Sequence, residues 1–224
     1  MSSDIDQSHQ RNTIIASEPV VRGTLFVVSS PSGGGKGTLI QRVLSSIPNL
    51  SYSISFTTRT PRNGEVNGRE YFFVTREQFE QMVAANDFLE WARVHGNSYG
   101  SSARQVSREI DEGRDIILEV DVQGAASIRK LVTYSVSVFI LPPSYDVLRQ
   151  RLLARGTDSD AELQVRLRNA PEEISQYTAF DYVIINDDVE RAAGCLASII
   201  VAERSRRERQ EPQVKQVFET FPLN

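Results

Sequence analysis

The sequence contains a glycine-rich stretch, Ser29–Leu39 (SSPSGGGKGTL), whose residue types suit the binding of a phosphate group. Anion binding at a helix N-terminus needs backbone N–H groups that are free to converge on one point. The glycines Gly33, Gly34 and Gly35 allow that convergence, and Lys36 adds a positive charge. The alternative interpretation is a glycine-rich turn without a ligand.

The segments on either side of this stretch favour phosphate binding. The apolar run Thr24–Ser29 predicts a buried strand, and Lys36–Ser46 carries apolar residues at helical spacing. A phosphate loop requires this order of strand, glycine loop and helix.

Two positions depart from the phosphate-loop pattern G-x-x-x-x-G-K-[ST]. Ser30 replaces the first glycine, and Gly37 replaces the hydroxyl residue, which is displaced to Thr38. The run Gly-Lys-Gly-Thr resembles the loops of nucleoside monophosphate kinases, in which the metal is held largely by phosphates and water. This resemblance implies that ATP and Mg²⁺ bind here, with Thr38 reaching the metal through water. The implied ATP contacts in the loop are Ser32, Gly33, Gly34, Gly35, Lys36, Gly37 and Thr38.

Alternation of apolar strand-like runs with helical patterns predicts an α/β fold with a central parallel sheet. Further strands are expected over Asp115–Asp121, Ser135–Leu141 and Tyr182–Ile185, followed by one final helix from Val189 to about Arg209. Segment 55–100 breaks the alternation with its own short strands and one helix. We therefore expect an insertion that carries a separate site.

The composition is that of a globular protein, with 40% apolar and 24% charged residues. A net charge of −4 argues against general nucleic-acid binding, and no apolar run is long enough to span a membrane. The single cysteine, Cys195, indicates a reducing cytoplasmic location, and we expect it to be packed. The run Glu203–Arg209 is expected to be a solvated helix end. Residues 1–21 are expected to be a disordered leader.

A second group of residues suits a small anionic ligand. Three arginines lie between Arg59 and Arg69 against one acid, Glu65. The surrounding stretches, SFTTRTPRNGEVNGREYFFV (55–74) and FLEWARVHGNSYGSS (88–102), resemble the acceptor-binding region of guanylate kinases. The resemblance extends to the loop, LEVDVQG (118–124), LLARGTDSD (152–160) and VIINDD (183–188), and covers about residues 22–208.

This resemblance implies an enzyme that transfers the terminal phosphate of ATP to GMP, giving GDP and ADP. It implies a three-layer P-loop NTPase-type fold with a small α+β GMP-binding insertion and a helical lid. The implied organisation is a kinase core (22–54, 101–145 and 171–209), the insertion (55–100), the lid (146–170) and a C-terminal tail (210–224). A homodimer is left open.

The implied GMP contacts combine phosphate-binding and base-binding side chains. Arg59 and Arg62 suit a bidentate grip on a phosphate dianion. Glu90 suits the two adjacent donors of guanine, N1–H and the 2-amino group, which adenine lacks. From spacing alone, Glu90 could equally be a charge on a strand surface. The implied set is Ser55, Arg59, Arg62, Tyr71, Glu90, Tyr99, Ser101, Glu119 and Asp121.

Asp121 follows a buried strand, where parallel sheets place their ligands, and it resembles the carboxylate that organises Mg²⁺. Glu119 stands where the family resemblance leads us to expect Asp, and an acidic strand end is the alternative. Lid arginines would stabilise the charge that spreads over the transferred group. Asn186 and Asp187 resemble an adenine-side turn, although Asn-Asp is also an ordinary helix cap. The implied catalytic set is Lys36, Arg59, Arg151, Arg155, Arg166 and Asp121, with Arg155 also contacting ATP.

Two alternatives stay open at the level of sequence. The first is a non-catalytic module that resembles guanylate kinases but binds peptides; such domains typically lose the loop lysine and the lid arginines, which this chain keeps. The second is a kinase for another phosphorylated acceptor, such as a ribosyl phosphate.

Overall fold

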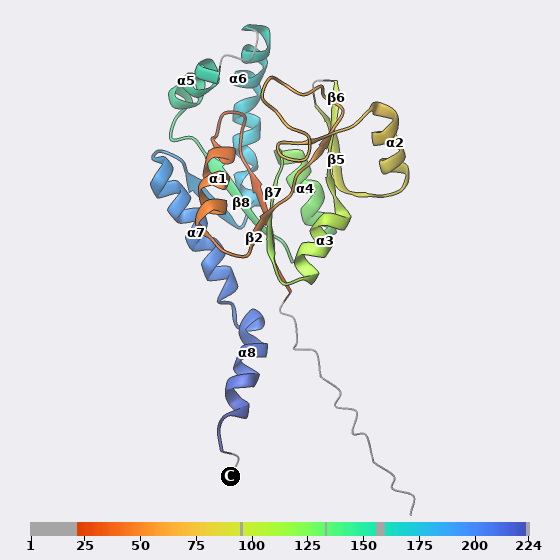
Figure 1. Ribbon diagram of the computed structural model, residues 1–224. Coiled ribbons are helices and arrows are strands. Elements are labelled where there is room, and N and C mark those ends of the chain that lie inside the picture. Colours follow the sequence, from red (N-terminus) through yellow and green to blue (C-terminus); the bar gives the residue numbers. More distant parts are fainter. Residues whose placement is uncertain (1–21, 95, 133, 156–159, 223–224) are drawn as a thin grey trace, which may run out of the picture.

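A computed structural model describes residues 22–94, 96–132, 134–155 and 160–222, without the side chains of Val94 and Arg155. The predicted leader, residues 1–21, lies outside this range. Figure 1 shows a central sheet with helices on both faces, a smaller sheet beside it, and a last helix that extends away from the body. In the described part of the chain, no helix has both the length and the apolar composition that crossing a membrane requires.

The central sheet has five parallel strands in the order β2-β7-β1-β8-β9. Their bounds are β1 Leu25–Ser29, β2 Leu50–Tyr52, β7 Asp115–Glu119, β8 Val136–Leu141 and β9 Tyr182–Ile185. The three inner strands, β7, β1 and β8, are buried on both faces, which explains why they are nearly continuous apolar runs. The predicted parallel sheet is confirmed.

Successive residues of β1 face opposite layers of helices, as the period of two requires. Phe26 and Val28 pack with α1 (Lys36–Ser46) and α7 (Val189–Arg204). Leu25 and Val27 pack with α3 (Ala103–Asp111) and α4 (Val122–Leu131) on the other face. The three-layer architecture is therefore confirmed.

The lid segment forms two helices with a core of their own. Leu148 and Leu152 of α5 (Tyr145–Arg155) pack against Leu163 and Leu167 of α6 (Asp160–Ser175). Pro171 lies inside α6, which runs to Ser175 and is followed by the short 3-10 helix η1 (Gln176–Ala179).

Segment 55–100 forms the second sheet, of four strands in the order β4-β3-β6-β5. The strands are β3 Phe56–Thr57, β4 Phe72–Phe73, β5 Phe88–Val94 and β6 Asn97–Ser102, with helix α2 at Arg76–Ala84. A capping box of Thr75 and Gln78 opens α2. Phe79 and Phe88 stack with ring centroids 4.6 Å apart and join α2 to β5. The insertion is thus a separate α+β unit.

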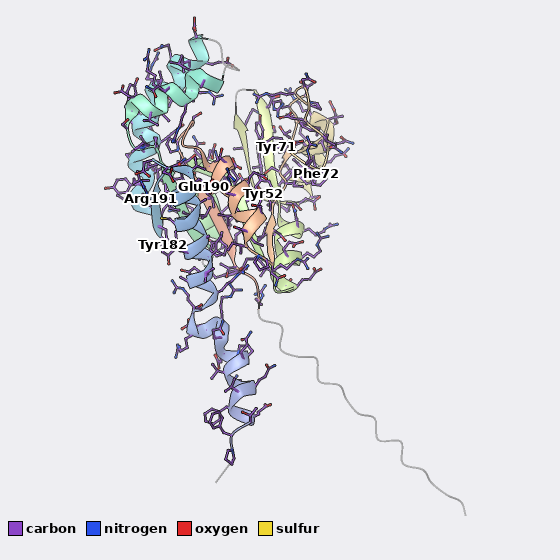
Figure 2. The ribbon with its side chains drawn as sticks, turned by 60° about the vertical axis from the view of Figure 1, so that its left-hand side comes forward. Tyr52, Tyr71, Phe72, Tyr182, Glu190 and Arg191 are labelled. Atoms are coloured by element: carbon purple, nitrogen blue, oxygen red, sulfur yellow. The ribbon has the colours of Figure 1, made fainter. Side chains whose placement is uncertain are left out.

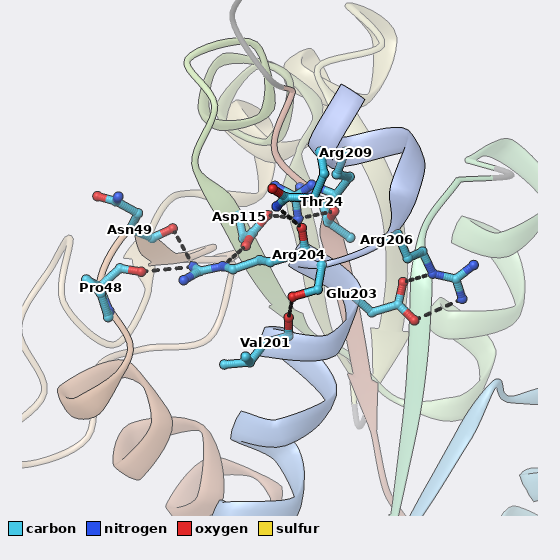
Figure 3. Close-up of polar contacts among 11 residues, drawn as sticks. Thr24, Pro48, Asn49, Asp115, Val201, Glu203, Arg204, Arg206 and Arg209 are labelled. Carbon is cyan, nitrogen blue, oxygen red and sulfur yellow. Dashed lines mark hydrogen bonds and ion pairs between the residues drawn. The ribbon is translucent and has the colours of Figure 1, made fainter. Parts of the chain in front are cut away.

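The end of the chain differs from the predicted single helix. α7 ends at Arg204, and a second helix, α8, runs from Arg207 to Glu219. Figure 3 shows why the helix divides: Arg204 Nε and Arg209 Nη1 both reach the buried Asp115 carboxylate, at 2.7 and 2.9 Å. The two arginines meet at one carboxylate only if the helix turns between them.

The prediction of a solvated end over Glu203–Arg209 is wrong for Glu203, Arg204 and Arg209, whereas residues 205–208 are exposed as predicted. Glu203 is 4% exposed and accepts hydrogen bonds from Tyr182 Oη, at 2.6 Å, and from Arg206. Arg209 also donates to Thr24 Oγ1 at 2.9 Å. Mixed charge along a sequence is typical of a solvated face. Here, however, Arg209 has partners from distant parts of the chain: Asp115 at the start of β7 and Thr24, the residue before β1.

Cys195 is exposed, so its predicted packing is also wrong. It lies with Val183 and Ile185 of β9 in a shallow surface groove. Because β9 is the last strand of the sheet, the outer side of α7 faces solvent at this edge.

Candidate functional site

The phosphate-loop stretch connects β1 to α1 in a conformation that only glycine readily adopts. Gly33 and Gly35 have φ values of 87° and 90°, in the left-handed region. A Cβ on Gly35 would lie 2.4 Å from Asn186 Nδ2, and one on Gly34 would lie 2.7 Å from Ser30 Cβ. Since Gly35 has no side chain that could cap α1, the first N–H groups of the helix face the loop without a capping side chain. Such a helix start suits an anion.

The loop is held from outside by Asn186, predicted to contact ATP, and by Arg151, predicted to act in catalysis. Asn186, which is 2% exposed, donates through Nδ2 to the Gly34 carbonyl at 2.9 Å. Arg151 donates to the Asn186 carbonyl at 2.8 Å and to the Gly34 carbonyl at 3.4 Å. The structure thus gives Asn186 a loop-supporting contact, whereas Asp187 is exposed and pairs with Arg191.

The lid touches the loop through α6 as well. Arg166 Nη1 donates to Ser32 Oγ at 2.7 Å, and the Ser32 N–H donates to Glu173 Oε2 at 3.1 Å. The backbone of Arg155 ends α5, but its side chain lies outside the described atoms. Arginines of both lid helices therefore reach the loop.

Lys36, the first residue of α1, points to the end of the neighbouring strand. Its Nζ lies 3.6 Å from Glu119 Oε1, and Tyr52 Oη donates to Glu119 Oε2 at 3.1 Å. Tyr52 and Glu119 end β2 and β7, which are adjacent in the sheet, so the carboxyl ends of parallel strands bring them together. Burial, followed by the nearby Glu119 charge, raises the pKa of Tyr52, so its hydroxyl stays a donor.

Sequence reasoning did not single out Tyr52. The usable signal was its place within a strand-like run, but its contact depends on β2 lying next to β7. Figure 2 shows Tyr52 and Tyr71, which come from the central sheet and the insertion respectively. Burial and then the Glu119 charge raise the pKa of Tyr71, so both tyrosines lie within electrostatic reach of this carboxylate.

The arginine-rich segment forms a compact arrangement beside these tyrosines. Arg59 Nη2 lies 2.8 Å from Glu65 Oε1, and the Arg59 guanidinium lies 5.5 Å from the Tyr71 ring centroid. The Tyr71 and Tyr99 rings are 5.9 Å apart. The Arg59 hydrogen bond lowers the pKa of Glu65, and the N–H of Arg62 donates to the same carboxylate at 2.7 Å. The Arg62 side chain is exposed.

Glu90 lies deeper in the insertion, paired with the strand opposite. Ser101 Oγ donates to Glu90 Oε1 at 2.7 Å, and the Ser55 and Ser101 hydroxyl oxygens are 3.5 Å apart. Burial raises the pKa of Glu90, the Ser101 hydrogen bond opposes this, and the Asp121 charge adds to it. A partly desolvated carboxylate suits adjacent N–H donors of a ligand.

Asp121 follows strand β7 of the central sheet and lies near Glu90. Its side chain caps α4 by accepting from the Gly124 N–H at 2.7 Å. A Cβ on Gly124 would lie 3.1 Å from Glu90 Oε2 and 3.3 Å from Asp121 Oδ1, so both carboxylates lie beside the first turn of α4. Gly124 was predicted only as part of a motif, and the structure shows why a glycine suits this position.

Comparison with known proteins identifies the family that carries this geometry. The family model described as guanylate kinase matches residues 22–203, most of the chain. The chain belongs to the guanylate kinase family. The predicted enzyme class, an ATP:GMP phosphotransferase, is therefore confirmed.

Relatives cover almost the whole chain. A guanylate kinase of Geobacter sulfurreducens is 43% identical over 196 residues, which are 88% of this chain and 97% of the relative. One from Neisseria gonorrhoeae is 49% identical over 189 residues, covering 84% and 92%. The crystal structure of guanylate kinase from Anaplasma phagocytophilum matches with a TM-score of 0.74 at 33% identity, covering 93% of this chain and 100% of that one.

The oxygen donors at the site suit Mg²⁺ bound mainly by substrate phosphates. Within the described residues, no group of three or more His, Cys, Asp or Glu side chains could hold a metal ion alone. Mg²⁺ commonly uses one or two carboxylates together with phosphates and water, and Asp121 and Glu119 meet that need. Thr38 is exposed in the first turn of α1. Gly37 lies beside Glu119, because a Cβ there would be in ordinary van der Waals contact with Oε2, at 3.8 Å.

Proposed function

We propose that ATP binds on the phosphate loop and GMP on the insertion, and that the phosphoryl group passes directly between them. The observation that carries this is the 3.6 Å contact between Lys36 Nζ and Glu119 Oε1. Glu119 also accepts from Tyr52 and raises the pKa of Tyr71, which stacks edge-on with Tyr99. The proximity of these groups supports two anion sites close enough for transfer.

The proposed reaction needs no covalent enzyme intermediate. A phosphate oxygen of GMP attacks the γ-phosphorus in line, the bond to the β,γ-bridging oxygen breaks, and ADP leaves with that electron pair. Lys36, Arg151, Arg155 and Arg166 would neutralise the charge on the transferred group. The loop residues Ser32, Gly33, Gly34, Gly35, Gly37 and Thr38, with Asn186 and Asp187, would hold or support ATP.

GMP would be held at both ends. Arg59, Arg62, Tyr71 and Tyr99 would bind its phosphate. Glu90 would accept from guanine N1–H and the 2-amino group, with Ser101 and Ser55 beside it, and adenine would leave the same carboxylate unpaired. In this proposal Arg59 exchanges its hydrogen bond to Glu65 for one to the substrate phosphate.

Mg²⁺, when bound, would neutralise phosphate charge and orient the transferred group. Asp121 and Glu119 would hold it indirectly, through water, with Thr38 as a further hydroxyl. We also propose the domain limits given above, a cytoplasmic location and a homodimer.

An acceptor panel tests the proposal. ADP formation from ATP is measured with GMP, dGMP, AMP and ribose 5-phosphate for the wild type and for Glu90→Gln. We expect GMP to be preferred over AMP by at least about 10³-fold, with most of that preference lost in the variant. Equal rates with GMP and AMP, or a preference unchanged in Glu90→Gln, would refute the role of Glu90.

A further inference from the structure

Two side chains of helix α6 hold one residue of the phosphate loop, Ser32. Arg166 Nη1 donates to Ser32 Oγ at 2.7 Å, and the Ser32 N–H donates to Glu173 Oε2 at 3.1 Å. Arg166 and Glu173 are seven residues apart in α6. Because that spacing is about two helical turns, they lie on the same face of the helix. Figure 1 shows α6 passing from the top of the molecule down towards the central sheet.

The apolar core of the lid packs directly beside this contact. A Cβ on Gly33 would lie 3.0 Å from both Leu148 Cδ1 and Leu152 Cγ of α5. These two leucines are almost fully buried and belong to one cluster with residues of α6, namely Leu163, Leu167 and Ala170. The loop is therefore fixed to the lid by close packing at Gly33 and by two hydrogen bonds at Ser32.

The half-buried Glu173 carboxylate binds the loop before its glycine run begins. Residues 33–36 lead into the N-terminus of α1, which has no capping side chain and suits an anion. Ser32 precedes them, so Glu173 accepts from an N–H group outside the proposed phosphate cradle. A hydrogen bond to an ionised carboxylate is stronger than one between neutral groups. Glu173 is thus suited to hold the loop without taking the place of the ATP phosphates.

The helix is interrupted electronically between the two contacts, because Pro171 lies between Arg166 and Glu173. A proline inside a helix lacks the N–H that would bond to the carbonyl four residues earlier, here that of Leu167. The half of α6 that carries Arg166 is therefore coupled less tightly to the half that carries Glu173. This arrangement allows Arg166 to exchange Ser32 Oγ for a substrate phosphate while Glu173 stays bound to the loop.

We propose that Glu173 is a positioning residue for phosphoryl transfer, which fixes α6 against the phosphate loop and thereby aims Arg166 at the transferred phosphate. The inference rests on the proposed role of Arg166 in neutralising charge on that phosphate. In this arrangement Glu173 touches neither nucleotide. Its loss misplaces a group that acts in the transition state, so the effect should appear in kcat rather than in KM.

Steady-state kinetics of GMP-dependent ADP formation test the proposal with three variants. Glu173→Ala should lower kcat by about 10-fold and change KM for ATP and for GMP by less than about 2-fold. Glu173→Gln keeps a carbonyl oxygen that accepts from the Ser32 N–H, so its kcat should stay within about 3-fold of the wild type. Glu172→Ala is the matched control, because the Glu172 side chain is exposed one residue away, and its kcat should be unchanged.

Three results would overturn the proposal. A lower KM for ATP in Glu173→Ala would show that the carboxylate competes with the ATP phosphates. Equal kcat losses in Glu173→Ala and Glu172→Ala would show that the contact with Ser32 is not used. A Glu173→Gln variant as slow as Glu173→Ala would show that the hydrogen bond is not what matters. Thermal unfolding and calorimetric titration with ATP show that each variant is folded and binds ATP.

A double-mutant cycle with Arg166→Ala shows whether Glu173 acts through Arg166. If it does, adding Glu173→Ala to Arg166→Ala should lower kcat by less than about a further 2-fold. A loss of about 10-fold from Glu173→Ala in both backgrounds would overturn the proposal and leave the role of Arg166 intact. A normal kcat in Arg166→Ala would instead refute the proposed role of Arg166, and the positioning role of Glu173 with it.

Discussion

Tyr52 Oη donates a 3.1 Å hydrogen bond to Glu119 Oε2, while the other oxygen of that carboxylate lies 3.6 Å from Lys36 Nζ. Glu119 is thereby oriented from two sides, by a strand end and by the start of a helix. The carboxylate lies between the proposed ATP and GMP sites, so its orientation bears on both.

Tyr52→Phe should lower kcat/KM for GMP by about 10-fold, because the variant loses a hydrogen bond to a charged group. Steady-state kinetics with varied GMP and varied ATP measure the effect, and thermal unfolding should shift little. Tyr134→Phe is the matched control, since Tyr134 is 59% exposed and borders Arg22 away from the site. Unchanged GMP kinetics in Tyr52→Phe would show that Lys36 and the strand alone orient Glu119.

Glu90→Gln should weaken GMP use and stabilise the fold at neutral pH. Burial raises the pKa of Glu90 above its ordinary 4.5, so the ionised carboxylate disfavours folding at pH 7. The glutamine should lower kcat/KM for GMP by about 10²-fold or more, since it cannot accept both guanine donors as an anion does.

Urea unfolding at pH 7 and pH 4 measures the stability part of this prediction. The variant should be more stable at pH 7, and its advantage should fall towards zero below pH 4.5, where both side chains are neutral. Glu80→Gln, at an exposed position of α2, is the control. If Glu90→Gln is less stable than the wild type at pH 7, the buried, ionised Glu90 carboxylate does not destabilise the fold, and the prediction is wrong.

Gly35→Ala should impair ATP binding and stability together. Residue 35 has a φ of 90°, and the added Cβ would lie 2.4 Å from Asn186 Nδ2. We expect a loss of about 1–3 kcal/mol of unfolding free energy and at least a 10-fold rise in KM for ATP. Gly194→Ala is the opposite case, because nothing lies within 4 Å of a Cβ there. This variant should raise the free energy of unfolding by about 0.5–1 kcal/mol. Equal stability of the two variants would argue against strain in the loop.

Asp115→Asn should destabilise the protein without altering catalysis per folded molecule. The carboxylate is 1% exposed and balances Arg204 and Arg209, so its neutralisation leaves two guanidinium groups uncompensated. Removal of one member of a buried pair costs about 3–5 kcal/mol. Asp111→Asn breaks only an exposed pair with Arg22 and should cost less than about 1 kcal/mol. Chemical denaturation measures the unfolding free energy of both variants, and GMP-dependent activity at low denaturant measures catalysis by the folded protein. Similar losses of unfolding free energy in Asp115→Asn and Asp111→Asn would refute the difference between the buried and the exposed ion pair.

The parts of the fold that depend on local pattern were predictable from the sequence. Strand Tyr182–Ile185 and helix Lys36–Ser46 occur with the predicted bounds, because buried parallel strands and amphipathic helices leave distinct apolar periods. The capping box of Thr75 and Gln78 is a signal of the same short range, because both residues lie within one turn of the start of α2.

The parts that depend on which elements become neighbours were not predictable in the same way. Tyr52 was missed because its role needs β2 beside β7, and Cys195 was assigned to the interior because β9 was not known to be the edge strand. The division between α7 and α8 reflects Arg204 and Arg209 meeting Asp115, which lies about 90 residues away along the chain. The roles of the site residues themselves came from the family resemblance and stay predictions.

Asp115 and Asp121 lie near opposite ends of strand β7 and serve different parts of the molecule. Asp115 begins the strand and anchors α8, whereas Asp121 follows its far end and faces the proposed substrates. Six residues of extended chain put about 20 Å between them. A fluorophore, affinity tag or sensor surface joined to the C-terminus should therefore leave nucleotide access unobstructed, and immobilised protein should turn over GMP at the rate measured in solution.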